Sequence, residues 1–180
     1  MIGPLSPSIV TVRRKPGAHS RGLLSVGGGS VVFHVALGKG GISALKREGD
    51  GATPRAEMAM LHGYWRTDKG PRPETALPMQ PIRHDAGWCD APWHAAYNRP
   101  VRLPFPASAE TMRRTDDLYD IVLVLDWNIA SRQAGRGSAI FMHLARPGYL
   151  PTEGCIALAR RDMLRLLRSV SSLTRVAVIG

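Results

Sequence analysis

Cysteine is scarce in this chain: its 180 residues include two, Cys89 and Cys155. Two cysteines allow one disulfide at most, so a small fold held together by several disulfides is excluded. A Cys89–Cys155 disulfide would be reasonable in an exported protein, but it would consume both thiols. We favour two free thiols.

Long apolar runs are also lacking. No stretch approaches the length needed to cross a bilayer, so we expect no integral membrane segment. Residues 1–10 lack the positively charged start and the uninterrupted apolar stretch of a secretory signal. Either export is not encoded in this chain, or the signal has been removed from it.

Nucleic-acid signatures are missing despite a formal net charge of +10. The arginines are scattered, aromatic residues make up only 6% of the chain, and no helix-turn-helix, zinc-finger or RNA-binding motif is present. We therefore expect no nucleic-acid partner. The charge alone is compatible with an anionic membrane surface or with a polyanionic matrix such as a bacterial wall.

Glycine and proline are abundant, with 19 and 14 residues, which favours short strands joined by many turns. One helix is expected at 160–170, where Met163, Leu164, Leu167 and Val170 form an apolar stripe. Residues 67–106 hold eight of the fourteen prolines and are expected to form a long irregular excursion. The expected strands are at 9–12, 23–26, 31–37, 56–65, 118–127, 138–144 and 174–179, the second and third forming a hairpin around Gly27–Gly29. The fold class is mainly β.

One histidine and one cysteine stand out as possible catalytic groups. In an extended strand at 138–144, period-two alternation places Ala139, Phe141 and His143 on one face. Cys155 follows twelve residues later, directly after Gly154. A nearby imidazole can take the proton of a thiol, and a glycine lets backbone N–H groups turn toward a developing oxyanion. Taken singly, each residue is more commonly structural.

Other constellations are weaker. His84, Cys89 and His94 are zinc ligands by type, but their spacing fits neither a finger nor a helical metalloprotease pair. The glycine-rich segments lack the Gly-Lys-Ser/Thr ending of a nucleotide loop. Glu110 and three nearby aspartates show no spacing that identifies a glycosidase acid and nucleophile. We expect no metal and no cofactor.

Residues 138–158 resemble the active-site motif of the L,D-transpeptidases of YkuD type, in which a histidine precedes a Ser/Thr-His-Gly-Cys turn. Residues 46–54, Lys-Arg-Glu-Gly-Asp-Gly-Ala-Thr-Pro, resemble the family's Lys-x-Glu-Gly-Asp-Gly-x-Thr-Pro segment. Three further stretches, at 87–90, 97–99 and 118–120, look like one branch of the family. The resemblance spans about residues 23–179.

The resemblance implies a β-sandwich with one main helix after the catalytic cysteine. It implies one catalytic domain over 21–180 with the excursion at 67–106, preceded by an N-terminal extension or first strand at 1–20. Cys155 would be the nucleophile, His143 the base and the backbone at Gly154 part of the oxyanion site. We expect substrate contacts from Arg146, Tyr149, Thr152, Glu153, Trp88 and Tyr97.

The implied activity is cross-linking of peptidoglycan stem peptides, of 3-3 or 1-3 type, through a cysteinyl acyl-enzyme. We expect a bacterial protein that acts as a monomer in the periplasm or at the cell wall. Two alternatives stay open. One is an L,D-carboxypeptidase or amidase that hydrolyses stem peptides or wall-linked protein, and the other is a non-catalytic, basic wall-binding module.

Two positions depart from the family pattern. Glu153 stands where the motif usually has histidine, and Ala157 stands where an arginine is often found. A carboxylate beside the nucleophile would raise the pKa of the thiol unless a cation offsets it. Arg146 is the expected source of that cation and a candidate to bind a substrate carboxylate.

Overall fold

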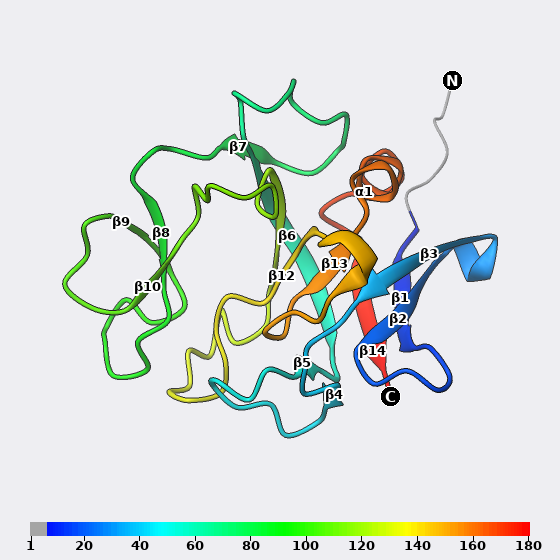
Figure 1. Ribbon diagram of the computed structural model, residues 1–180, viewed down its shortest axis with the longest axis horizontal. Coiled ribbons are helices and arrows are strands. Elements are labelled where there is room, and N and C mark those ends of the chain that lie inside the picture. The colour runs from blue at the N-terminus through cyan, green and yellow to red at the C-terminus, as the bar shows by residue number, and fades with distance from the viewer. Residues whose placement is uncertain (1–6) are drawn as a thin grey trace.

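The structure is a computed structural model that describes residues 7–180, so the expectation about a signal in residues 1–10 lies mostly outside it. These residues form strands with a single α-helix, α1 (Arg160–Leu167), and the predicted mainly β class is confirmed. Figure 1 shows the arrangement. The strands are β1 (Ile9–Arg14), β2 (Arg21–Val26), β3 (Val31–Ala36), β4 (Ile42–Ser43), β5 (Thr53–Pro54), β6 (Glu57–Trp65), β7 (Met79–Pro81), β8 (Ala86–Cys89), β9 (Pro100–Arg102), β10 (Ala109–Thr111), β11 (Ile121–Leu125), β12 (Phe141–Leu144), β13 (Ile156–Leu158) and β14 (Arg175–Ile179).

The main sheet has nine strands in the order β11-β12-β13-β3-β2-β1-β14-β6-β7. Because β11 also pairs with β6, the sheet closes on itself. The predicted β2–β3 hairpin is present, and its turn is the short 3-10 segment η1 (Gly27–Gly29). The first strand, β1, lies inside the sheet between β2 and β14.

The larger core lies between the strands and the helix. Alternate residues of the main strands point into it, as Val10 and Val12 do from β1. Helix α1 adds Met163, Leu166 and Leu167. The predicted helix was three residues too long, and Leu164 was wrongly placed in the stripe, since it is 37% exposed while Leu166 is fully buried.

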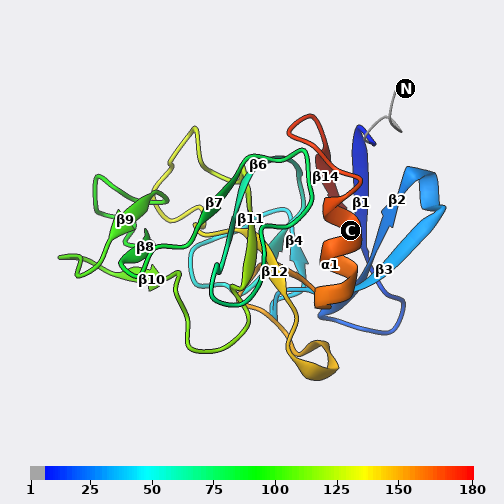
Figure 2. The ribbon, with the colours of Figure 1, turned by 90° about the horizontal axis from the view of Figure 1, so that it is seen from above.

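The opposite face of β11 and β12 packs beneath a second layer. Val122, Val124 and Phe141 point away from the larger core into a second core cluster that includes Trp88 and Tyr119. This burial on both faces explains the nearly continuous apolar sequence of β11. The second layer is built around a three-stranded sheet, β10-β8-β9, which lies at the left of Figures 1 and 2, on the far side of the molecule from α1.

The excursion at 67–106 is therefore more regular than predicted. It contains β7, β8 and β9, and its prolines lie at strand ends or in the connections between strands. Pro100 begins β9 and Pro81 ends β7, positions where a missing N–H costs little.

The strand predicted at 138–144 begins only at Phe141. Ala139 has a φ of +51°, outside the extended region, so residues 138–140 are not part of the ladder. The predicted alternation nevertheless holds: Ile140, Met142 and Leu144 belong to the larger core, whereas Ala139 and Phe141 belong to the second cluster.

Candidate active site

A cavity of about 410 Å³ lies where the second layer meets β12 and β13. His143 and Cys155 both line it. His143 lies on β12, and Cys155 directly precedes β13, the parallel neighbour in which Ile156 pairs with Met142 and Ala157 with His143. Because Cys155 precedes Ile156, it lies on the same face as His143, one diagonal step away. The structure thus brings the two predicted groups together in one cavity.

The turn before Cys155 is held by Thr152. Its hydroxyl donates to the Cys155 carbonyl (2.6 Å) and accepts from the Gly154 N–H (3.2 Å). Gly154 has a φ of +133°, and a Cβ there would lie 2.8 Å from the Ala52 carbonyl oxygen. Glycine is required at this position by conformation and by space. Thr152 therefore shapes the turn, although it also lines the cavity.

The Cys155 thiol is 8% exposed and bonded to the backbone. It donates to the Ala139 carbonyl (3.2 Å) and accepts from the Phe141 N–H (3.4 Å). Burial raises the pKa of this thiol to about 12, and the negative charge of Glu110 adds to the rise. In the resting site the group is a neutral thiol.

His143 is also neutral at pH 7. The residue is 6% exposed, and burial lowers the pKa of its imidazole to about 4. Nδ1 lies 2.9 Å from the Leu144 carbonyl oxygen. Since a carbonyl can only accept, Nδ1 carries the proton and Nε2 is left as the basic nitrogen. The Tyr119 ring packs edge-on against the imidazole, with centroids 5.2 Å apart.

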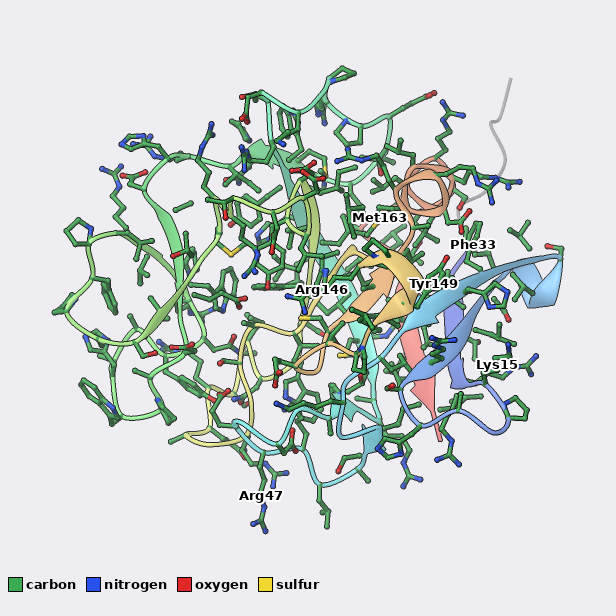
Figure 3. The ribbon with its side chains drawn as sticks, viewed as in Figure 1. Lys15, Phe33, Arg47, Arg146, Tyr149 and Met163 are labelled. Atoms are coloured by element: carbon green, nitrogen blue, oxygen red, sulfur yellow. The ribbon has the colours of Figure 1, made fainter. Side chains whose placement is uncertain are left out.

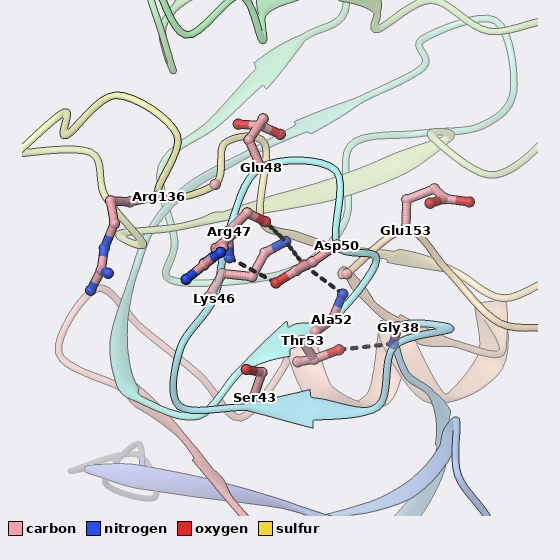
Figure 4. Close-up of polar contacts among 12 residues, drawn as sticks. Gly38, Ser43, Lys46, Arg47, Glu48, Asp50, Ala52, Thr53, Arg136 and Glu153 are labelled. Carbon is pink, nitrogen blue, oxygen red and sulfur yellow. Dashed lines mark hydrogen bonds and ion pairs between the residues drawn. The ribbon is translucent and has the colours of Figure 1, made fainter.

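The segment 46–54 lies against the turn that contains Gly154, and Figure 4 shows its polar contacts. Lys46 is 2% exposed, donates to the Arg47 carbonyl and pairs with Asp50. Asp50 also accepts from the N–H groups of Arg47 and Ala52. These bonds fix the Ala52 carbonyl against which Gly154 packs.

The cation that pairs with Glu153 is not the predicted Arg146. Glu153 pairs with Lys39 (2.8 Å), and it is the least of the causes that raise the pKa of Cys155. The cation that lowers the pKa of this thiol is Lys46. Arg146 instead acts on His143, whose pKa its charge lowers. Arg146 is exposed and lines the cavity, where it remains available to a substrate.

Three of the predicted substrate contacts lie outside the cavity lining. Trp88 is 2% exposed and donates from Nε1 to Asn98 Oδ1 (3.0 Å). Tyr97 is 3% exposed, and its hydroxyl donates to Glu48, which does line the cavity. Tyr149 lies on the short 3-10 segment after β12 (Figure 3), and its ring centroid is 6.3 Å from that of His34 on β3. Trp88 and Tyr97 are therefore buried core residues that hold Asn98 and Glu48 in place.

Sequence reasoning missed several cavity residues. Asp90 and Glu110 come from the second layer, Tyr119 directly precedes β11, and all three line the cavity. Tyr119 donates to Glu110 Oε1 (2.5 Å), and burial raises the pKa of both groups. The available signal was the branch-like stretches at 87–90 and 118–120, which contain Asp90 and Tyr119.

Comparison with known families agrees with this geometry. The YkuD family, the L,D-transpeptidase catalytic domain, matches residues 16–178. The chain belongs to this family. The resemblance noted at 46–54 and 138–158 is thereby confirmed.

The chain also resembles the crystal structure of L,D-transpeptidase 1 of Mycobacterium tuberculosis, with a TM-score of 0.42 and 11% identity, over 96% of this chain and 62% of that one. The YkuD chain thus spans less than two thirds of that protein. No curated protein matches the sequence.

Both cysteines are free thiols. Within residues 7–180, His84, Cys89 and His94 do not come together, and no three His, Cys, Asp or Glu side chains form a group that could hold a metal ion. No helix within residues 7–180 is long and apolar enough to cross a bilayer.

Proposed function

We propose that this protein is a peptidoglycan L,D-transpeptidase that joins stem peptides through an acyl-enzyme on Cys155. The proposal includes action at the cell wall or in the periplasm, as a monomer, with cross-links of 3-3 or 1-3 type. The observation that supports it is that His143 on β12 and Cys155, directly before the parallel strand β13, line one shared cavity.

Acylation begins from a neutral pair. The thiol leaves its backbone contact at Ala139 and passes its proton to Nε2 of His143 as the sulfur attacks the carbonyl of an L-configured donor residue. Proton transfer and attack are coupled, because burial disfavours a thiolate–imidazolium pair in the empty site. The departing amine then takes the proton from the imidazolium.

The oxyanion needs N–H donors near the sulfur. The Gly154 N–H is engaged with Thr152 Oγ1, so we assign this role first to the N–H of Cys155 itself, at the turn that Gly154 makes possible. Arg146, exposed at the cavity edge, binds a carboxylate of the donor stem. Glu153, held by Lys39, borders the same side.

The second half-reaction separates transfer from hydrolysis. An amine of a neighbouring stem attacks the thioester, the new C–N bond forms, and the C–S bond breaks to return Cys155. Water attacking the same thioester would give a shortened monomer. The second layer, which covers the outer face of β12, limits access of water to the thioester.

The test is incubation of the protein with purified tetrapeptide stems, followed by mass spectrometry of the products. Cross-linked dimers are expected, and fragmentation of a dimer identifies donor position 1 or 3. Shortened monomers without dimers would favour the carboxypeptidase or amidase alternative. Cys155→Ala should abolish turnover, and turnover that survives would refute the nucleophile.

A carbapenem supplies an independent readout. We expect a covalent adduct that peptide mapping locates at Cys155 and that the Cys155→Ala variant lacks. A wall-binding module would instead bind isolated wall material equally well with and without Cys155 and would turn over no substrate.

A further inference from the structure

Two carboxylates face the cavity from the second layer. In the β8–β10 ladder Trp88 pairs with Glu110 and Cys89 with Ala109. Alternation therefore places Glu110 and Asp90, which follows β8, on one face of this small sheet. Both line the cavity together with Cys155. The negative charge of Glu110 also raises the pKa of the Cys155 thiol, which places the two groups within electrostatic reach of each other.

The cavity is acidic although the protein is basic. The chain carries a net charge of +10, yet the lining has four carboxylates and only two guanidinium groups. One guanidinium, that of Arg114, makes two hydrogen bonds to Asp116 and lies 3.9 Å from Glu110. The carboxylates are Glu48, Asp90, Glu110 and Glu153.

Two polar atoms of the lining lack partners. Asp90 Oδ1 and Ser138 Oγ are inaccessible and make no hydrogen bond to any described residue. Ser138 as a whole is 7% exposed. Buried polar atoms are normally bonded, and a carboxylate oxygen can be satisfied only by a donor. The Asp90 carboxylate thus lacks a donor, and the surplus of carboxylates in the lining favours one that is positively charged.

We propose that Asp90 and Glu110 bind the primary ammonium group of the acceptor stem and that Glu110 removes its proton. This inference rests on the proposed function and deepens it. Glu110 becomes a catalytic residue of the second half-reaction, and Asp90 a residue that selects amines over water.

The chemistry balances without any further reactant. Glu110 takes one proton from the ammonium and leaves a free amine, whose lone pair attacks the thioester carbonyl. The C–N bond forms and the C–S bond breaks. The second proton passes from the nitrogen through His143 to the departing sulfur, and Glu110 returns its proton to solvent. Burial raises the pKa of Glu110, which brings its basicity closer to neutral pH.

The first experiment measures how the acyl-enzyme partitions. Wild type, Glu110→Gln and Asp90→Asn are acylated with a tetrapeptide donor, and acylation is followed by intact mass. A diamino acceptor stem is then added, and the ratio of dimer to hydrolysed donor is measured. Glu74→Gln, which removes one surface carboxylate paired with Arg168, is the matched control.

We expect both variants still to form the acyl-enzyme, Glu110→Gln no more slowly than wild type because its charge no longer raises the pKa of the Cys155 thiol, while the transfer ratio falls about tenfold or more. The control should keep the wild-type ratio. Ratios within about twofold of wild type in both variants, or equal loss of acylation and transfer, would overturn the inference. If the wild type itself never acylates, it is the proposed function that fails.

A binding measurement keeps the ammonium site testable in that case. Calorimetry with the Cys155→Ala protein compares the acceptor stem with an analogue in which a hydroxyl replaces the side-chain amine. We expect the amine to bind more tightly, and the added Glu110→Gln change to remove that preference. Equal affinity for the two ligands would refute an ammonium site. Urea unfolding of each variant verifies that it is folded.

Discussion

Substitution of Asn98 should lower the free energy of unfolding, because this residue joins three segments around the site. Its side chain is fully buried, and Oδ1 accepts from Trp88 Nε1–H and from the Ala139 N–H, both at 3.0 Å. Nδ2 donates to the Trp127 carbonyl at 3.0 Å. Asn98 thus ties the second layer to residue 139, whose carbonyl accepts the hydrogen bond of the Cys155 thiol.

Asn98→Ala would leave two buried donors without acceptors. Each unsatisfied group costs about 1–3 kcal/mol, so we expect a loss of about 4 kcal/mol in the free energy of unfolding. The matched control is Asn128→Ala. Asn98 and Asn128 both adopt a left-handed backbone, with φ of 56° and 52°, so the conformational cost of alanine is shared. Asn128 is only partly buried, and water can replace its partners.

Urea unfolding at pH 7 measures both variants. The difference between them should be about 2 kcal/mol or more, with Asn98→Ala the less stable. Iodoacetamide should also react faster with Cys155 in Asn98→Ala, because residue 139 loses its anchor. Equal destabilisation of the two variants would refute the view that Asn98 is the buried hub of the site.

Three further outcomes follow from the site geometry. The alkylation rate of Cys155 should be low at pH 7 and rise about tenfold per pH unit well into the alkaline range, because the thiol pKa is about 12. A plateau near neutrality, corrected with Cys155→Ala, would instead indicate a preformed ion pair. His143 has a folded pKa of about 4 against 6.5 when unfolded, so the unfolded chain binds its proton first and stability should fall as pH drops from 6.5 to 4. Unfolding at several pH values should show a shallower slope for His143→Gln, and identical slopes would contradict the assignment. Gly154→Ala should abolish acylation and cost about 2 kcal/mol or more, because its Cβ would meet the Ala52 carbonyl oxygen. Gly148→Ala, also at positive φ but with nothing within 4 Å, is the control for a positive φ without a clash, and similar acylation by both variants would contradict the prediction.

Much of the fold was predictable because its signals are local. Alternation along residues 138–144 placed His143 on the face of Phe141 and opposite Met142, and the structure agrees even though Ala139 leaves the strand. The β2–β3 hairpin, the buried strand β11 and helix α1 follow from short apolar patterns of the same kind. The paired motifs at 46–54 and 138–158 likewise indicated the family from adjacent residues.

The tertiary structure alone decided what surrounds the sulfur. The parallel pairing of β12 with β13 brings Cys155 beside His143. Neither segment by itself predicts which strand it will pair with. Asp90 and Glu110 come from the second layer, where the many prolines led us to expect irregular structure in place of strands.

The tertiary structure also decided that Cys155 and His143 are both neutral in the resting site. Alternation and turn formation depend on neighbours in the chain, so the sequence by itself determined most of the strands, the helix and the two groups that we propose as catalytic. Protonation depends on desolvation and on charges brought in by distant segments, so only the folded molecule decided that the thiol and the imidazole rest uncharged.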